Sequence, residues 1–210
     1  MKVYFVNPPF KAEYGKFSRE NRSPAVTRSG TFYYPLWLIY AAAVCEKEGF
    51  EVEFLDAPAS PLNIEQSLDV IQSNGAGTRL FVMETSTPSL ANDIYFLEKV
   101  KQIYPDAIYV MVGTHVSALP EETLGFSDKI DAVTRKEFDY IIRDIAKCLR
   151  DGKEWTNIEG ITYRKGNKII SNPDMPYIEN LDEIPFAAKF IKEHLDYKDY
   201  FFAGSYYPEI

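Results

Sequence analysis

The chain has 210 residues, of which 46% are hydrophobic and 26% are charged, a length and composition that suit one globular core with an appendage. Its formal net charge of −8 would be repelled by phosphate backbones, which argues against a nucleic-acid partner. No apolar run approaches the roughly 18 residues of a membrane span, and the N-terminus lacks a signal-peptide pattern, so we expect a soluble, cytoplasmic protein.

Strand-like and helix-like segments alternate along the first 150 residues. The expected strands are 2–6, 51–55, 80–83, 107–112 and a weaker one at 130–133; the expected helices are 35–48, 63–73, 89–104, a short one from about 120, and 137–150. Residues 10–34 have no steady period and predict a long irregular loop. This alternation predicts an α/β fold with a five-stranded parallel sheet, and right-handed crossovers favour the doubly wound, Rossmann-like (flavodoxin-like) order 2-1-3-4-5.

The character of the sequence changes after residue 150. The stretch IEGITYRKGNKIISNP predicts a small β-hairpin that turns at Gly166 and Asn167. From residue 173 the chain is rich in proline and aromatic residues and shows no clean long helix, so we expect an irregular tail. We therefore divide the chain into a Rossmann-like domain, 1–150, and a hairpin with a linker, 151–210.

Ligands of an open parallel sheet bind beyond the carboxyl ends of its strands. The candidate cofactor-binding residues are those that follow the strands: Asn7, Pro8, Pro9, Thr85, Ser86, Thr87, Pro88, Ser89, Gly113, Thr114, His115, Arg135 and Glu137. Gly113 would let a ligand or another backbone come close. Thr87 or Ser89 would cap the next helix and offer its N–H groups to a ligand. Each residue also has a purely structural interpretation, as a helix cap, a turn or a loop hydrogen bond.

Several common ligand sites of this architecture are excluded. The acidic residues of a phosphoacceptor receiver domain, the GxGxxG of a dinucleotide site and the P-loop are all missing. The two cysteines form no CxxC or CxxxCxxC, so the chain cannot build an iron–sulfur cluster or a thiolate metal site alone. A flavodoxin-like flavin or nucleotide site stays open, as does a cofactor-free interaction module that uses the aromatic tail.

Six stretches resemble a known family. In chain order they are VNPP, YYPLWLIYAAAVCEKEGFEVEFLDA, VGTHVSALPEETL, DAVTRKEFDYIIRDI, IEGITYRKGNKIISNP and IENLDEIPF. Together they resemble the N-terminal cobalamin (vitamin B12) binding domain of B12-dependent radical SAM proteins, a group that includes anaerobic Mg-protoporphyrin IX monomethyl ester cyclases and methyltransferases. The resemblance covers nearly the whole chain.

The resemblance implies a function and a set of partners. Cobalamin would lie against the carboxyl edge of the sheet, among the candidate residues above. In the family, a following radical SAM core, in cis, holds a [4Fe–4S] cluster and S-adenosylmethionine for methyl transfer or radical cyclisation. The motif of that core is missing here, so we expect a truncated form or a stand-alone cobalamin carrier that cannot cleave S-adenosylmethionine by itself.

The sequence departs from related patterns at three points. The DxHxxG motif that gives a histidine to cobalt in many B12 domains is absent, which implies base-off cobalamin without that axial histidine. Gly113 and Thr114 replace a usual Gly-Gly, and Lys136 replaces a glycine before Glu137, where it would crowd the corrin edge or reach a propionamide. On this interpretation Gly113 lets a flat macrocycle approach, and His115 bonds the corrin periphery or a neighbouring loop.

Overall fold

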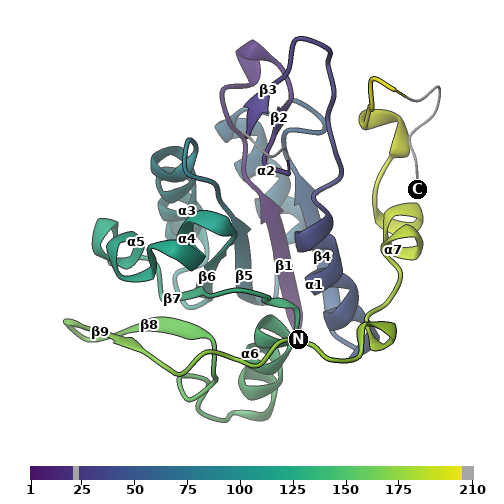
Figure 1. Cartoon of the computed structure of the whole chain (residues 1–210). Helices are drawn as coiled ribbons and strands as arrows, with labels where there is room; N and C mark the ends of the chain where they lie inside the picture. The colour runs from purple at the N-terminus through teal and green to yellow at the C-terminus, as the bar shows by residue number, and fades with distance from the viewer. Residues whose placement is uncertain (21–23, 205–210) are drawn as a thin grey trace.

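The centre of the molecule is a seven-stranded sheet in the order β4-β1-β5-β6-β7-β8-β9 (Figure 1). The structure is a computed structural model that describes residues 1–20 and 24–204. Five strands run parallel: β4 (Glu51–Asp56), β1 (Lys2–Asn7), β5 (Thr78–Glu84), β6 (Ile108–Val112) and β7 (Ala132–Thr134). Taken in chain order, these strands lie in the predicted order 2-1-3-4-5, so the doubly wound prediction is confirmed.

Helices cover both faces of the sheet. One layer contains α1 (Leu36–Lys47) and α6 (Asp139–Asp151); the other contains α2 (Ile64–Asn74), α3 (Leu90–Ile103) and α5 (Pro120–Phe126). Successive side chains of β1 alternate between the layers, because Val3 and Phe5 pack with α1 and α6 whereas Tyr4 and Val6 pack with α2 and α3. The central strands are therefore buried on both sides, as their unbroken apolar sequences predict.

Local signals explain where two of the helices begin or end. At the start of α2 the Asn63 side chain accepts from the Gln66 N–H, and the Gln66 side chain accepts from the Asn63 N–H, both at 2.9 Å. At the end of α6, Gly152 takes the left-handed conformation with a φ of 66°. The predicted boundaries of the long helices consequently lie within two residues of the observed ones.

The sheet has seven strands instead of the expected five, because the hairpin joins it. Strand β8 (Ile161–Lys165) pairs antiparallel with β7, and β9 (Lys168–Ser171) pairs with β8. The predicted turn is confirmed, with Gly166 at a φ of 60°. Without the hairpin, β7 would be an edge strand with unpaired backbone groups, and β8 pairs with them. It is thus part of the same sheet.

Four shorter elements correct the sequence analysis. Helix α4 (Thr114–Ala118) begins directly after Gly113, so Thr114 and His115 are helical and do not lie in a loop. The loop 10–34 is not wholly irregular, since β2 (Phe17–Ser18) pairs with β3 (Ala25–Val26). The tail contains α7 (Ala187–His194). Helices this short depend on tertiary contacts, which local sequence patterns do not report.

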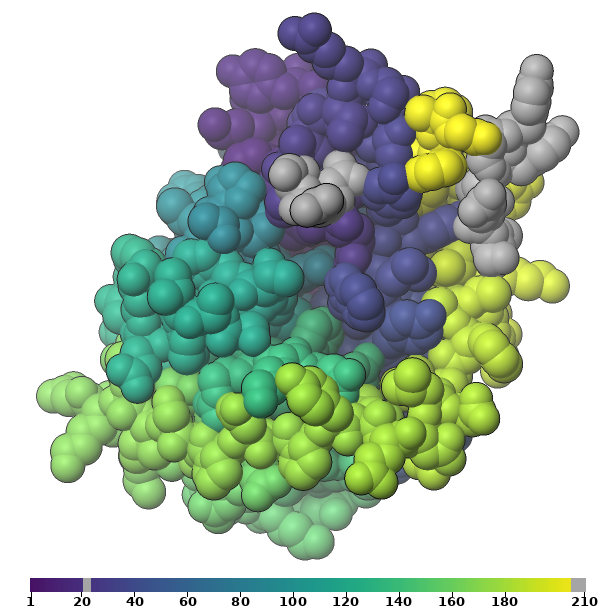
Figure 2. All heavy atoms as spheres, viewed as in Figure 1, coloured from purple at the N-terminus to yellow at the C-terminus, as the bar shows by residue number. Residues whose placement is uncertain are grey.

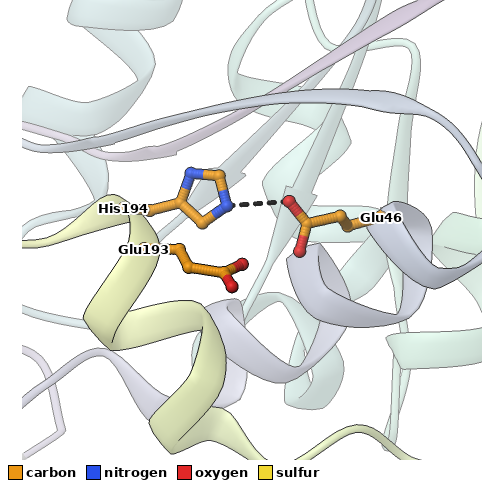
Figure 3. Close-up of side chains that lie close together, drawn as sticks. All are labelled: Glu46, Glu193 and His194. Atoms are coloured by element: carbon orange, nitrogen blue, oxygen red, sulfur yellow. Dashed lines mark hydrogen bonds and ion pairs between the residues drawn. The ribbon is translucent and has the colours of Figure 1, made fainter.

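Helix α7 lies along α1, where it is attached by packing and by a polar contact. Phe190 and Ile191 are buried in the same core cluster as α1. His194 Nε2 lies 2.8 Å from Glu46 Oε1, with the Glu193 carboxylate beside them (Figure 3). The His194 ring stacks on Phe190 with centroids 4.2 Å apart. Among the described residues, no helix is both long and apolar enough to cross a membrane.

Candidate functional site

A cavity of about 1010 Å³ opens beyond the carboxyl ends of β5, β6 and β7. Its inner wall comes from the sheet edge, at Glu84, Thr85, Gly113 and Thr114. Its outer wall comes from the start of α1 and from residues 177–186 of the C-terminal segment. In Figure 2 this face is hollowed between the teal surface of α4 and α5, the blue start of α1 and the yellow-green C-terminal segment below. Far-separated parts of the chain thus enclose one site.

Four of the thirteen candidate residues line this cavity: Thr85, Gly113, Thr114 and Glu137. The other nine do not: Asn7, Pro8, Pro9, Ser86, Thr87, Pro88, Ser89, His115 and Arg135. The structure places most of these nine in hydrogen bonds behind or beside the wall, where they fix the loops that carry the lining residues. Pro88 lies exposed in the turn before α3.

Gly113 is required by a neighbouring backbone. Its φ is 118°, and a Cβ at this position would lie 2.3 Å from the carbonyl oxygen of Thr85. The Thr85 N–H donates to the Val112 carbonyl at 2.9 Å, so the two strand ends are drawn together. Of the two approaches that the sequence left open, ligand or backbone, the structure shows the backbone.

The end of β1 and the residues that follow it hold a buried arginine from the loop 10–34. Arg19 donates from Nη1 to Asn7 Oδ1 at 2.5 Å and to the Pro8 carbonyl at 3.0 Å. Its Nη2 lies 2.6 Å from Asp93 Oδ1, and the two side chains are 1% and 0% exposed. The Pro9 carbonyl accepts from an α3 side chain. A buried ion pair of this kind is costly to break, so it anchors the loop against β1 and α3.

The hydroxyl cluster after β5 serves the same ion pair. Thr85 Oγ1 and Ser89 Oγ donate to Asp93 Oδ2 at 2.8 and 2.6 Å, and the Ser86 and Ser89 hydroxyls lie 2.8 Å apart. Ser89 precedes α3 but makes no side-chain cap, so the predicted capping role is wrong. Burial raises the pKa of Asp93, while Arg19 and the two hydroxyls oppose that shift.

His115 faces a neighbouring loop. Its Nδ1 lies 3.1 Å from Thr87 Oγ1. Its Nε2 is buried and has no hydrogen-bond partner. The histidine therefore ties α4 to the loop before α3, one of the two roles expected for it.

Arg135 and Lys136 follow β7, and their side chains have different partners. The Arg135 guanidinium binds the hairpin, through the Ile161 carbonyl at 2.8 Å and Thr162 Oγ1 at 2.6 Å. Lys136 lines the cavity and has a φ of 61°, a conformation that favours glycine. Its Nζ lies 2.8 Å from Asp174 Oδ2. The lysine thus adopts a left-handed backbone conformation that suits glycine, the residue that the resemblance implies here.

Glu137 joins the two walls of the cavity. Its Oε2 accepts from the Ile178 N–H at 2.9 Å, which holds the C-terminal segment against the end of β7. Asp139, two residues on, also lines the cavity, and burial raises its pKa to about 6. Glu137 and Asp139 thus place two carboxyl groups side by side in the cavity lining. The bond to Ile178 makes the C-terminal segment part of the site.

Sequence reasoning missed several residues that line the cavity. Arg19, Glu20, Trp37 and Tyr177 line the cavity but follow no strand of the sheet. The lack of any period in residues 10–34 was the one sequence signal for the first two, because long irregular loops in compact domains are commonly functional. No local signal marked Trp37 or Tyr177.

The sequence of the chain matches one family model and several known proteins. The family model described as B12 binding domain matches residues 22–146. An uncharacterized methyltransferase of Pyrococcus horikoshii is 31% identical over 190 residues, which cover 90% of this chain and 38% of that protein. The anaerobic magnesium-protoporphyrin IX monomethyl ester cyclase of Rubrivivax gelatinosus is 25% identical over 155 residues, 71% of this chain and 28% of its own length. The chain thus spans well under half of these relatives.

Two solved structures share the fold. The radical S-adenosylmethionine methyltransferase TsrM from Kitasatospora setae, with cobalamin and a [4Fe–4S] cluster bound, has a TM-score of 0.65 at 16% identity, over 88% of this chain and 30% of that one. The cobalamin-dependent S-adenosylmethionine radical enzyme OxsB, with aqua-cobalamin and S-adenosylmethionine bound, has a TM-score of 0.68 at 15% identity, over 90% and 25%.

Proposed function

Because the chain belongs to the B12 binding domain family, we propose that it holds cobalamin in the cavity beyond β5, β6 and β7. The observation that carries the proposal is the position of the cavity at the carboxyl edge of a doubly wound sheet, where such sheets bind their ligands. Its volume of about 1010 Å³ is at the upper end of small-molecule sites, as a large cofactor requires.

The chemistry of the lining fits a corrinoid. A corrin ring is broad and flat, with apolar faces and amide side chains at its rim. The outer wall offers exposed apolar surfaces at Trp37, Tyr177 and Phe186, which are 62%, 63% and 87% exposed. The inner wall offers the polar side chains of Thr114 and Glu137. We assign the apolar residues to the ring and the polar ones to its rim.

Cobalamin, when bound, supplies cobalt chemistry such as the carriage of a methyl group, while the protein supplies position and environment. The chain has two histidines, and neither lines the cavity: His115 bonds Thr87, and His194 lies on α7 beside Glu46. We therefore propose that this chain gives cobalt no axial histidine, and, from the family resemblance, that cobalamin binds base-off.

We also propose that the domain works within a longer protein. Residues 1–150 would form the cobalamin-binding unit, and 151–210 would lead toward a radical SAM core in cis that holds a [4Fe–4S] cluster and S-adenosylmethionine. A second hollow, with exposed Tyr33, Phe186, Phe201 and Phe202 on its walls, supports a covering partner on this side. Methyl transfer and cyclisation are the two reactions that the relatives' names support.

A bulky substitution at the sheet edge tests the binding site. Thr114 is exposed and lines the cavity, so Thr114→Trp would fill the site without disturbing the core. We expect it to weaken hydroxocobalamin binding at least tenfold, or about 1.4 kcal/mol, measured by absorbance titration. The matched control is Glu122→Trp, at an exposed position of α5 outside the cavity lining, which should bind as the unsubstituted protein does. Equal affinity in both variants would place the cofactor elsewhere.

A further inference from the structure

Two carboxyl groups meet in the wall of the cavity. Glu84 is the last residue of β5 and is buried, and Glu20 stands at the end of the described loop segment that carries Arg19. Both line the cavity, and the two carboxyls lie close enough together for each to shift the pKa of the other. Two ionised carboxylates are both acceptors and repel each other, so a close approach of this kind favours one shared proton.

Two buried carboxyl oxygens that lack a hydrogen-bond donor also support a proton on the pair. Oε1 of Glu20 and Oε2 of Glu84 are both buried, and neither has a donor. The backbone N–H of Trp37, at the start of α1, acts on Glu20 and partly opposes the rise of its pKa. One proton on the pair supplies the donor that the structure otherwise lacks.

The charges around the pair favour that proton. The groups that act on Glu84 are the guanidinium of Arg19 and the carboxyls of Asp56, Asp93 and Glu20. The carboxyls of Glu84 and Asp56 act on Glu20. The guanidinium of Arg19 is already engaged at 2.6 Å by Asp93. Burial, together with this excess of carboxyls, raises the pKa of both groups.

We propose that Glu20 and Glu84 share one proton at neutral pH and that cobalamin binds together with this proton, covering the pair. The second part rests on the proposed function. A ligand over this wall removes the remaining water from Glu20, which is half-buried without it. Loss of water disfavours the charged form, so ligand and proton stabilise each other. The pair thereby becomes a recognition element that links cofactor affinity to pH.

The proton can be tested without any cofactor. Infrared spectra of the ligand-free protein at pH 7.5 should contain a protonated-carboxyl band that is reduced in both Glu20→Gln and Glu84→Gln. The matched control, Glu122→Gln, is an exposed residue outside the cavity and should keep the band. A spectrum with the same band in all four proteins would overturn the shared proton.

The coupling is tested by calorimetry with cyanocobalamin, whose upper ligand exchanges no proton in this range. At pH 9 the free pair has begun to release its proton, so titrations at that pH in buffers of different ionisation enthalpy should show net proton uptake on binding. The affinity should fall as the pH rises from 7 to 10, by at most about tenfold per pH unit. Both glutamine variants should bind with neither proton uptake nor this slope, and Glu122→Gln should retain both.

The possible failures are distinguishable. Cyanocobalamin binding without proton uptake would overturn the coupling and leave the proposed function standing. No binding at any pH would reject the proposed function and the coupling together, while the infrared band would still decide whether the pair holds a proton.

Discussion

Gly113 has no room for a side chain, because an added Cβ would clash with the carbonyl oxygen of Thr85. Gly113→Ala combines that clash with a φ of 118°, which only glycine adopts freely. We expect it to lower the free energy of unfolding by roughly 3 kcal/mol or more, measured by urea denaturation.

The matched control is Gly49→Ala. Gly49 also has a positive φ, 81°, but nothing lies within 4 Å of its added Cβ. It should lose only about 1 kcal/mol, the cost of the backbone conformation. Equal losses in the two variants would mean that the contact with Thr85 contributes nothing.

The types of residue at the sheet edge could be predicted from the sequence, but their partners could not. The rule that ligands bind beyond strand ends leads directly to Thr85, Gly113, Thr114 and Glu137. It cannot separate them from Ser89, which turns to Asp93. The orientation of a short side chain is decided by the nearest buried charge, and Arg19 comes from a loop seventy residues away in sequence.

The aromatic side chain of Tyr200 attaches the C-terminal segment to the rest of the fold. Tyr200 stacks on Tyr34 at 4.1 Å, and its hydroxyl donates to buried Asp56 Oδ2 at 2.7 Å. Tyr200→Phe leaves that carboxylate oxygen without its donor, which should cost about 1–3 kcal/mol. Hydrogen exchange should then speed up in residues 187–204.

Tyr197→Phe is the control for this change. Tyr197 lies in the same segment but is 45% exposed, so its stability should change by no more than about 0.5 kcal/mol. If both variants exchange at the unsubstituted rate, the bond to Asp56 does not hold the segment.

Elements with strong periodicity were predicted well, and elements that depend on docking were not. The long helices and the hairpin follow from local patterns. Helix α4 is five residues long and α7 is eight, and each packs against a core cluster formed by residues distant in sequence. The joining of β8 to β7 likewise depends on a free edge that only the assembled sheet reveals.

At the scale of the whole molecule, buried acids set the response to pH. Burial raises the pKa of Asp56 and of Asp139 to about 6, above their ordinary value near 4. The folded state therefore holds protons that the unfolded state releases, and this stabilisation is lost as the pH rises through 6. We expect the protein to be roughly 1–3 kcal/mol more stable at pH 5 than at pH 7.5.

The carboxyls with lowered pKa values, such as Asp174 beside Lys136, act in the opposite sense but only below about pH 4. Urea unfolding at the two pH values measures the difference, and Asp139→Asn should reduce it. A stability that rises from pH 5 to pH 7.5 would contradict this account of the buried acids.

The architecture as a whole was the most predictable level, because order 2-1-3-4-5 follows from alternation and crossover handedness. The enclosure of the cavity was the least predictable. It requires Arg19, Glu20 and Pro24 to lie around the same cavity as residues 177–186, and no local sequence pattern in either segment indicates the other.

The central claim is that this domain binds cobalamin, and the most direct measurement is retention of the cofactor. The purified chain is mixed with hydroxocobalamin and desalted, and the retained cobalt is quantified beside the absorbance spectrum. The account predicts close to one cobalt per chain and a base-off spectrum. A desalted protein with no cobalt, under conditions where it is folded, would contradict it.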